Sequence, residues 1–566
     1  MNYYIQLKKS NCKNCYKCIR NCPVKSIRFA DHQAHIVKEQ CILCGQCFIA
    51  CPQNAKQIRN DVRTVKDMIA SGRPVVASLA PSFVANYEGS DIASMREALL
   101  GLGFSDVEET AIGATVVKQE YDAMIRSGDS SVIISSCCHT VNTLIQKYYP
   151  EALPYLANVL SPMQAHCLGI KERFPGAYTV FLGPCISKKD EAEQYPGIVD
   201  CVLTFEELSE WLEESAPGGL TGLFHPQDTK KDDNPQGRAR LFPIPGGIIR
   251  SMLPQLEGYH YFAVDGIENC MNALTNIVSG NLTNCFIEMS ACSGSCVGGP
   301  AMEKEHRMPI TDYLRINQYA KEKDFEVQAP SKNQLEKHFA FLGAHSQMPG
   351  SRAIDEILHK MGKASPDQEL NCGSCGYNTC RDKAIAVYQG KADLTMCLPF
   401  LKEKAENFSD NIIFNMPNGV IVLNEDLEVQ QINRAAKQIL NISHKGDILG
   451  QPVIRILNPA SYLQVMTAGR NIHDKLTYLD DYQKYVEETI IYDRTYHIII
   501  SIMKDVTLEE TSRIKKENLN RQTVEIADKV IEKQMRVVQE IASLLGETTA
   551  ETKIALTNLK ESLKNE

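Results

Sequence analysis

The segment Glu288-Met-Ser-Ala-Cys292-Ser-Gly-Ser-Cys296-Val-Gly-Gly-Pro300 holds two cysteines among glycines and other small residues. Glycine lets a backbone approach a bulky group closely. The 566-residue chain contains 21 cysteines, and most of them stand in similarly tight spacings. In a reducing compartment such spacings are typical of metal ligands rather than disulfides. The segment is therefore expected to form part of a metal-cluster site.

Two further cysteine-bearing segments lie upstream of it. They are Ser135-Ser-Cys137-Cys138-His139 and Gly183-Pro-Cys185-Ile-Ser-Lys188-Lys-Asp-Glu191. Each follows an apolar run that predicts a strand, and α/β folds bind ligands at the carboxyl ends of their strands. Four thiolates from the three loops could enclose a cubane cluster, and a fifth, Cys137, would remain beside it.

The surrounding region, residues 70–365, alternates β-rich apolar runs with polar, helix-like stretches. Examples of the apolar runs are Pro74–Ala80, Ser131–Ile134 and Tyr178–Leu182. This alternation predicts an α/β domain with largely parallel strands. A polar insert near Pro217–Arg238 is expected to be a surface loop.

The three segments resemble the signature motifs of the [FeFe]-hydrogenase family, in order and in separation. The resemblance covers about residues 1–365, and three other stretches support it. They are Ser161-Pro-Met-Gln164, Phe242-Pro-Ile-Pro-Gly246-Gly247 and the Gly113…Glu120 segment. The resemblance implies reversible H₂ oxidation and proton reduction at an H-cluster, a [4Fe–4S] cubane joined to a two-iron subcluster with CO and CN⁻ ligands.

The resemblance also implies roles for single residues. The cubane ligands would be Cys138, Cys185, Cys292 and Cys296, the last of which would bridge to the subcluster. Cys137 would pass protons to the bridging amine of the subcluster, and Lys188 would hydrogen-bond a cyanide. Glu120 falls near the first glutamate of the family's proton path. Glu191 is a second candidate for proton transfer, or else a salt-bridge partner.

Four positions depart from the pattern of the family's enzymes. They are His139 in place of a proline, Gly183 and Ser290 in place of methionines, and Ala123 in place of the second proton-path glutamate. Residues around a cluster tune its potential and reactivity, so the ligands remain but turnover is expected to be low. His139 is either a proton relay or a capping or core residue. The pattern looks like the sensory branch of the family, in which a PAS domain is appended.

Residues 1–60 carry a doubled cysteine pattern. It is Cys12-x2-Cys15-x2-Cys18-x3-Cys22-Pro23, repeated as Cys41-x2-Cys44-x2-Cys47-x3-Cys51-Pro52. Bacterial two-cluster ferredoxins have this pattern, and in them the fourth cysteine of each run ligates the other cluster. The two predicted [4Fe–4S] sites are therefore Cys12, Cys15, Cys18 and Cys51, and Cys41, Cys44, Cys47 and Cys22. Zinc is the alternative, and two full repeats argue against it.

A second cysteine island occupies residues 366–400. Its pattern, Cys372-x2-Cys375-x4-Cys380-x16-Cys397, resembles a small [4Fe–4S] domain of electron-transfer and corrinoid proteins. Four cysteines also suit zinc, so both metals stay open here. The cysteines without partner spacing are expected to be buried small hydrophobes; they are Cys167, Cys201, Cys270 and Cys285.

Met416-Pro-Asn-Gly-Val-Ile-Val-Leu-Asn-Glu-Asp426 predicts a strand and a turn, and Ile432-Asn-Arg-Ala-Ala436 predicts a strand that leads into a helix. With these stretches, residues 408–505 resemble a PAS domain, an α+β fold. His497 could bind haem, although a structural role in the closing strand Thr495–Ser501 is the plainer interpretation. Residues 506–566 are charged and helical, with a turn expected at Gly546. Their apolar stripe predicts signalling or dimerisation helices of the coiled-coil kind. The stripe comprises Val524, Ala527, Ile531, Met535, Val538, Ala542 and Leu545.

The composition and charge of the chain argue against several classes of function. The net charge is −9 without a Lys/Arg-rich block, so nucleic-acid and anionic-membrane binding are not expected. No apolar run reaches the ~18 residues of a membrane span, and the N-terminus lacks a signal-peptide core. These features predict a cytoplasmic protein.

Together the segments predict a multidomain α/β protein that senses H₂ as a hydrogenase of low turnover. Electrons are expected to pass through the ferredoxin clusters, with a carrier such as ferredoxin, and the cluster redox state to reach the PAS domain and helices. Other expected partners are hydrogenase maturation proteins, a separate kinase or phosphatase as output, and a second copy in a homodimer. The alternatives are a non-catalytic iron–sulfur regulator or assembly protein on the same fold, and a plain metabolic ferredoxin hydrogenase.

Overall fold

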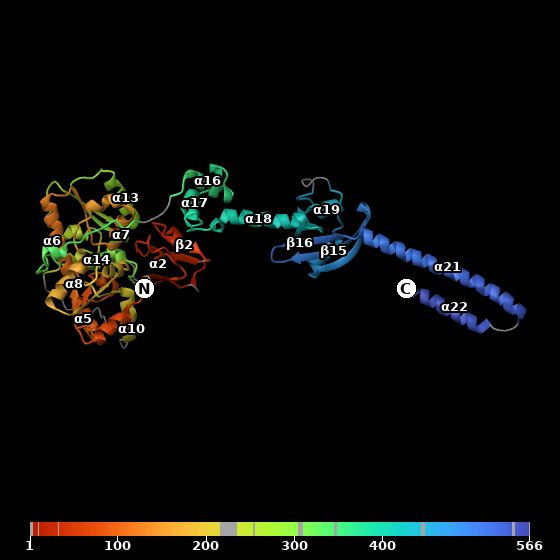
Figure 1. The fold of residues 1–566 in the computed structure, drawn as a ribbon, viewed down its shortest axis with the longest axis horizontal. Helices are drawn as coiled ribbons and strands as arrows, with labels where there is room; N and C mark the ends of the chain where they lie inside the picture. The colour runs from red at the N-terminus through yellow and green to blue at the C-terminus, as the bar shows by residue number, and fades with distance from the viewer. Residues whose placement is uncertain are drawn as a thin grey trace. The chain divides into compact units, whose positions relative to one another are not determined.

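The computed structural model describes residues 4–8, 11–31, 33–215, 235–252, 255–303, 309–343, 348–442, 448–545 and 549–564. The chain divides into two compact units, Met1–Phe400 and Leu401–Glu566, whose ribbons are drawn in Figure 1. No described helix is long and apolar enough to cross a membrane. The expected loop near Pro217–Arg238 falls largely outside the described residues, and so does the expected turn at Gly546.

The N-terminal part folds as two similar halves. Its elements are β1 (Ile5–Leu7), α1 (Lys17–Arg20), β2 (Ile27–Ala30), β3 (Gln33–Ile36), α2 (Gln46–Ile49) and β4 (Lys56–Ile58). β1 pairs antiparallel with β4, and β2 pairs antiparallel with β3. Each one-turn helix begins after a residue with positive φ, Tyr16 at 55° and Gly45 at 74°. The repeated cysteine pattern thus accompanies a repeated fold.

The next part is an α/β body with two sheets of parallel strands. The first sheet has the order β6 (Asp106–Glu109), β5 (Val75–Leu79), β8 (Tyr178–Gly183) and β9 (Cys201–Thr204). The second has the order β10 (His260–Asp265), β11 (Cys285–Ser290) and β7 (Val132–Ile134). All pairings within both sheets are parallel, which confirms the expected strand direction. Every residue of β5 is buried, as is usual where helices cover both faces of a parallel sheet.

Helices connect and cover these strands. The longer ones are α3 (Val62–Ala70), α5 (Ile92–Gly101), α6 (Ala111–Ser127), α7 (His139–Tyr148), α8 (Pro162–Arg173), α9 (Ser187–Gln194), α10 (Phe205–Ser215), α13 (Ile267–Val278) and α14 (Pro309–Tyr319). The short ones are α4 (Phe83–Asn86), η2 (Pro150–Tyr155), η3 (Arg238–Leu241), α12 (Gly247–Ser251), η4 (Ser295–Gly298) and α15 (Lys332–Leu335). The four cysteines without partner spacing are buried in this body, as expected.

The second cysteine island is a compact helical piece of the same unit. Its elements are α16 (Ser351–Lys360), η6 (Pro366–Gln368), α17 (Cys380–Tyr388), η7 (Leu394–Met396) and the start of α18 (Leu398–Asn415). Thr379 caps α17, because its side chain accepts a hydrogen bond from the Asp382 N–H while Asp382 bonds back. Leu358 and Met361 of the α16 region pack against Cys397 and Ala384 to form the small core.

The described part of the C-terminal unit is built on an antiparallel sheet followed by two helices, α21 and α22. The sheet has the order β13 (Val429–Ile432), β12 (Gly419–Asn424), β16 (Ile498–Asp505), β15 (Lys484–Asp493) and β14 (Ile472–Leu479). Shorter helices precede β14: α19 (Arg434–Ile439), η9 (Val453–Arg455) and α20 (Ala460–Ala468); η10 (Asp480–Tyr482) follows it. The chain continues into α21 (Thr507–Leu545) and α22 (Thr549–Lys564), joined by an ion pair between Asp528 and Lys560 at 3.1 Å. The α+β character and the helical end are therefore as expected.

Candidate functional site

The two parallel sheets bring the three cysteine segments to one place. Cys137 follows β7, Cys292 follows β11, and these strands pair with Ile134 opposite Ile287. Cys185 follows β8 of the other sheet. All three segments therefore leave the carboxyl ends of parallel strands, where α/β folds place ligands.

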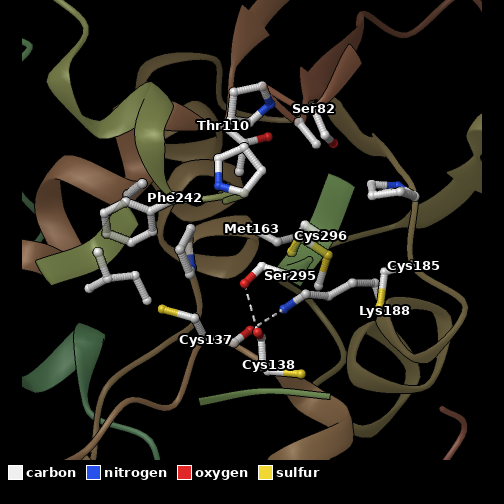
Figure 2. A pocket seen from close by; sticks show the side chains of 18 of the residues that line it. Ser82, Thr110, Cys137, Cys138, Met163, Cys185, Lys188, Phe242, Ser295 and Cys296 are labelled. Carbon is white, nitrogen blue, oxygen red and sulfur yellow. Dashed lines mark hydrogen bonds between the residues drawn. The ribbon is translucent and has the colours of Figure 1, made fainter. Parts of the chain in front are cut away.

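These strand ends surround a largely apolar pocket with about 860 Å³ of space not filled by atoms. Its lining includes Cys137, Cys138, Cys185, Cys296 and Lys188. In Figure 2 the sulfur of Cys137 lies apart from the other three labelled cysteine sulfurs, on the other side of the Lys188 ammonium from Cys185. The pocket thus separates one cysteine from the predicted ligands.

The four predicted ligands form a mutually repelling group of sulfurs. Cys296 is exposed and the other three are half-buried, and Cys138, Cys185 and Cys296 line the pocket. Desolvation by the surrounding protein, and then Cys185, raise the pKa of Cys138. The same causes, joined by Cys138, raise the pKa of Cys292 and Cys296 well above the ordinary range. Four converging sulfur donors need positive charge among them, which the irons of a cubane supply. The donor set therefore fits the cluster.

Cys137 stands beside this group as a protonated thiol. Desolvation raises its pKa to about 12, against the opposing effects of Tyr121 and Lys188. Tyr121 Oη lies 3.1 Å from Cys137 Sγ and accepts a hydrogen bond from the Ser136 N–H at 2.9 Å. The Tyr121 proton is consequently free to be shared with Cys137 Sγ or with Ser136 Oγ, which is 3.3 Å away.

Lys188 is the cation that faces the pocket. Its Nζ donates to the Cys137 carbonyl oxygen at 3.0 Å and to Glu191. Burial disfavours the ammonium, but Glu191 outweighs burial and raises the Lys188 pKa. A buried cation with this orientation suits an anionic group in the pocket.

Glu191 lies between two lysines and is fully buried. Lys337 Nζ donates to Glu191 Oε1 at 2.6 Å and to Gln164 Oε1 at 2.8 Å, and Ser161 Oγ donates to Glu191 Oε2 at 3.1 Å. Burial opposes ionisation, yet Lys188 and Lys337 hold the Glu191 pKa well below its ordinary value. This environment favours the salt-bridge interpretation over proton transfer. Lys337 had no spacing signal in the sequence.

The predicted proton-path residue Glu120 is half-buried on α6. Among the described residues, no hydrogen bond or ion pair joins Glu120 to Cys137; its neighbour Tyr121 makes that contact. Glu288, to which sequence patterns assigned no role, lines the pocket instead and is 3% exposed. Burial raises the Glu288 pKa to about 7, while backbone donors led by the Ile249 N–H, 3.1 Å away, oppose the rise. The sequence feature that could have pointed to Glu288 is its position as a lone carboxylate in an otherwise apolar strand.

His139 also lines the pocket. Its Nε2 lies 2.8 Å from Asp190 Oδ2, which anchors the ring against α9. In the described part of the chain, His139 Nδ1 is buried and has no hydrogen-bond partner. The ring is therefore held by the protein on one side only.

The ferredoxin-like cysteines gather in the two groups that their spacing predicts. Cys22, Cys41, Cys44 and Cys47 line one small pocket. In the other group, desolvation raises the Cys18 pKa to about 11, with further upward effects of Cys12, Cys15 and Cys51. Cys44 is also among the charges that raise the Cys292 pKa. The Cys22 group is thus the one beside the hydrogenase-like pocket.

The four cysteines of the island line a pocket of their own, Cys372, Cys375, Cys380 and Cys397. Lys383 is buried next to them, and desolvation lowers its pKa to about 8 against the effect of Cys375. No three described Cys, His, Asp or Glu side chains anywhere are spaced around a single metal ion. The cysteines of these sites are instead spread around small pockets.

Family models match three parts of the chain. Residues 73–300 match the iron only hydrogenase large subunit, C-terminal domain. The chain carries an iron-only hydrogenase domain. Residues 4–52 match a 4Fe-4S dicluster domain, and residues 368–399 match an Fe–S cluster family, which favours a cluster over zinc at the island. These domains support the expected cofactors, [4Fe–4S] clusters and an H-cluster.

Several curated proteins are similar over parts of the chain. Iron hydrogenase 1 of Clostridium pasteurianum is 24% identical over 310 residues, which are 44% of this chain and 53% of that protein. The periplasmic [Fe] hydrogenase large subunit of Nitratidesulfovibrio vulgaris is 25% identical over 52% of this chain and 86% of that protein. The cytosolic Fe-S cluster assembly factor NAR1 of Eremothecium gossypii is 28% identical over 25% of this chain and 35% of its own length. The match thus spans about half the length of the Clostridium relative.

Solved structures of two kinds are similar to parts of the chain. A variant of [FeFe]-hydrogenase HydA1 from Chlamydomonas reinhardtii covers 50% of this chain and 100% of its own, at 17% identity and a TM-score of 0.41. The PAS domain of nitrogen regulation protein NR(II) from Vibrio parahaemolyticus covers 17% of this chain and 96% of its own, at 20% identity and a TM-score of 0.15.

Proposed function

We propose that this protein oxidises H₂ and reduces protons at an H-cluster, and that it reports the redox state of its clusters as an H₂ sensor. The observation that carries the proposal is the Cys137 thiol, which stands beside four converging cysteines without joining them. When bound, the H-cluster would supply the iron site at which the H–H bond breaks or forms. Its ligands would be Cys138, Cys185, Cys292 and Cys296.

The chain's own groups have separate tasks in this reaction. Cys137 holds a proton at Sγ and exchanges it with the pocket, and Tyr121 is the hydroxyl within reach to share it. Lys188 offers a charged N–H to an anionic ligand, while Glu191 and Lys337 fix its position. The apolar lining limits water, which strengthens these polar contacts. A [4Fe–4S] cluster held by Cys22, Cys41, Cys44 and Cys47 would accept the electrons of H₂ one at a time, since Cys44 is close enough to Cys292 to affect it electrostatically.

Two features favour sensing over fast turnover. Residues beside the predicted ligands depart from the enzymatic pattern at His139, Gly183 and Ser290. The chain then continues into the α+β sheet and the helices α21 and α22. The partners that this function requires are an electron carrier such as ferredoxin, hydrogenase maturation proteins and a separate output protein, a kinase or phosphatase. A homodimer through the C-terminal helices is also proposed.

Infrared spectroscopy tests the chemistry directly. Protein matured anaerobically with a synthetic two-iron precursor should show the bands of bound CO and CN⁻, and a Cys296→Ala control should lose them. A protein that loads its [4Fe–4S] clusters yet never shows these bands would not be a hydrogenase.

The second candidate is an iron–sulfur assembly protein. The similarity to the assembly factor NAR1 favours it, whereas the free thiol of Cys137 beside Lys188 has no evident use in assembly. The same infrared experiment separates the two candidates, because an assembly protein would bind [4Fe–4S] clusters without CO and CN⁻.

A further inference from the structure

The cysteine island is packed against the ferredoxin-like part of the chain. One buried core joins Ile19 and Cys22 from the ferredoxin-like part to Cys375, Tyr377 and Met396 of the island. A Cβ built on Gly376 would lie 3.0 Å from the Ile19 Cβ, so any larger residue would force Ile19 back by a few tenths of an ångström. Gly376 also has a φ of +92°, which side chains rarely adopt. The close contact is therefore built into the island's cysteine loop.

Polar contacts hold the two surfaces in register. Lys25 Nζ donates to the carbonyl oxygens of Ile19 at 3.2 Å, Arg20 at 3.0 Å and Gly376 at 3.1 Å. Lys25 thus ties α1 to the island loop with a single ammonium. At the other end of the contact, the Phe29 N–H on β2 donates to the Lys391 carbonyl oxygen at 2.7 Å. The Arg20 guanidinium reaches the Ser374 carbonyl oxygen at 3.3 Å.

Tyr377 marks the point where the two cysteine sites meet. Its ring packs in the buried core that contains both Cys375 of the island and Cys22 of the ferredoxin-like part. Tyr377 is 2% exposed, and in the described part of the chain its hydroxyl is buried without a hydrogen-bond partner. A buried donor of this kind calls for an acceptor, and the sulfurs of a cluster at either site are suitable acceptors.

We infer that the island is a docked electron-exchange partner of the Cys22 group, held there by Lys25 and Gly376, and that the Cys22 group is a branch point. One branch leads to the Cys12 group and the other to Cys372–Cys397. In each exchange one electron leaves one site and reduces the other; under the proposed function, H₂ oxidation supplies it. The inference rests on the proposed function only for this source of electrons.

The experiment uses the full chain with all clusters, reduced with dithionite, so that it needs neither H₂ nor an H-cluster. Electron paramagnetic resonance should show a spin–spin interaction between the reduced island cluster and a ferredoxin-like cluster. Cys15→Ser, in the Cys12 group, should leave the interaction in place, whereas Cys44→Ser should abolish it. Hydrogen exchange supplies an independent readout, because the Phe29 amide should be protected by its bond to Lys391.

Ala386→Arg should undock the island. Ala386 lies on α17 in the core shared with the ferredoxin-like part, while Ala384 on the same helix packs inside the island. We expect unchanged iron content, loss of the spin–spin interaction and at least about tenfold faster exchange of the Phe29 amide. Tyr388→Arg places the same charge at an exposed position of α17 and should change neither readout.

Independent cluster signals in the wild-type protein, with a freely exchanging Phe29 amide, would overturn the inference even if Ala386→Arg failed to assemble. An interaction that survives Cys44→Ser but not Cys15→Ser would also overturn it, because the branch would then start at the other group. Absence of CO and CN⁻ bands would refute the hydrogenase proposal and leave the docking result standing.

Discussion

Cys137 and Cys138 are adjacent, yet the structure gives them different surroundings. Desolvation and then Cys185 raise the pKa of Cys138, whereas the Cys137 thiol contacts the Tyr121 hydroxyl and the Cys137 carbonyl oxygen accepts from Lys188. Cys137→Ala should therefore keep the CO and CN⁻ bands and lower H₂ turnover at least about 100-fold, or about 2.7 kcal/mol of barrier. Cys138→Ala should instead prevent cluster assembly. The reverse pattern, with assembly lost only in Cys137→Ala, would exchange the two roles.

Lys337 gives the pocket a second cation behind Glu191. Lys337→Met would leave Glu191 to pair with Lys188 alone, so Lys188 should offer less charge to the pocket. We expect shifted CN⁻ bands and a lower midpoint potential, by on the order of tens of millivolts for a charge about 10 Å away at an effective dielectric of about 20. Lys332→Met, exposed on α15, is the control. Unchanged bands and potential would reduce Lys337 to a packing role.

Glu288 should make stability depend on pH. Burial raises its pKa from 4.5 to about 7, so the folded protein holds a proton that the unfolded chain has already lost between these values. Stability should consequently fall as the pH rises through this window. Calorimetry should show that Glu288→Gln removes part of the fall between pH 4.5 and about pH 7, while exposed Glu257→Gln does not. Parallel curves for wild type and Glu288→Gln would show that Glu288 titrates normally.

Whether a site residue could be predicted from the sequence depended on how far along the chain it lies from its partners in the site. The four-residue spacing of Cys292 and Cys296 predicts two ligands of one site, because residues so near along the chain must also lie close in space. Lys337 reaches Glu191 from 146 positions away, and the antiparallel bridge of Val159 to Glu336 helps to bring it there. Tyr121 is the direct neighbour of the predicted Glu120. Successive residues of a helix point in different directions, so on α6 Tyr121 faces Cys137 and Glu120 does not.

Helix α21 has two apolar faces with different environments. Along the predicted stripe, from Val524 to Val538, the residues are half-buried. A second row is more exposed and repeats at spacings of seven and four residues: Leu519, Ile526, Val530, Val537 and Ile541. The two spacings add up to an eleven-residue repeat, which keeps the row on one face of the helix, where a partner helix can pack. The pair of helices α21 and α22 therefore leaves this exposed row available to pack against a second copy of the chain.

Dimerisation should depend on the exposed row. Ile526→Glu with Val530→Glu removes two apolar side chains per copy, at about 1.5 kcal/mol or more each. The dissociation constant of the dimer should rise at least about 100-fold in analytical ultracentrifugation. Lys529→Glu, an exposed neighbour, should leave it unchanged. If the wild-type protein is a monomer, or if its dimer tolerates both changes, the exposed row does not form a dimer interface.

The closing strand shows where sequence patterns fall short for an element. The expected strand Thr495–Ser501 begins only at Ile498, because His497 lies in the turn with a φ of 55°. Its ring is exposed and lies 2.9 Å from Glu425, which is a surface contact rather than an inward-facing haem ligand. An alternating pattern predicts which face of the sheet each strand residue lies on. It does not show where the preceding turn ends, because a tight turn depends on backbone geometry that a run of β-branched residues does not reveal.

The order of the parts along the chain matches a path for a signal. The hydrogenase domain, the ferredoxin-like part and the island belong to one unit, and α18 starts directly after Cys397 and runs into the second unit. A reduced island would therefore act on the first residues of α18. A signal needs two states of the C-terminal unit that oxidised and reduced clusters favour differently.

H₂ should accordingly change the C-terminal helices of the full-length protein. Hydrogen exchange in residues 507–564 should differ between H₂ and argon, and Cys375→Ser should abolish the difference without abolishing H₂ oxidation. A chain that ends at Phe400 keeps the docked island, so its low H₂ activity should stay within about twofold of the full-length value. Cys285→Ser, a buried cysteine outside every site, controls for the loss of a thiol. High turnover with helices that exchange identically under both gases would mean that the protein is a metabolic hydrogenase, in which the C-terminal unit only pairs two copies.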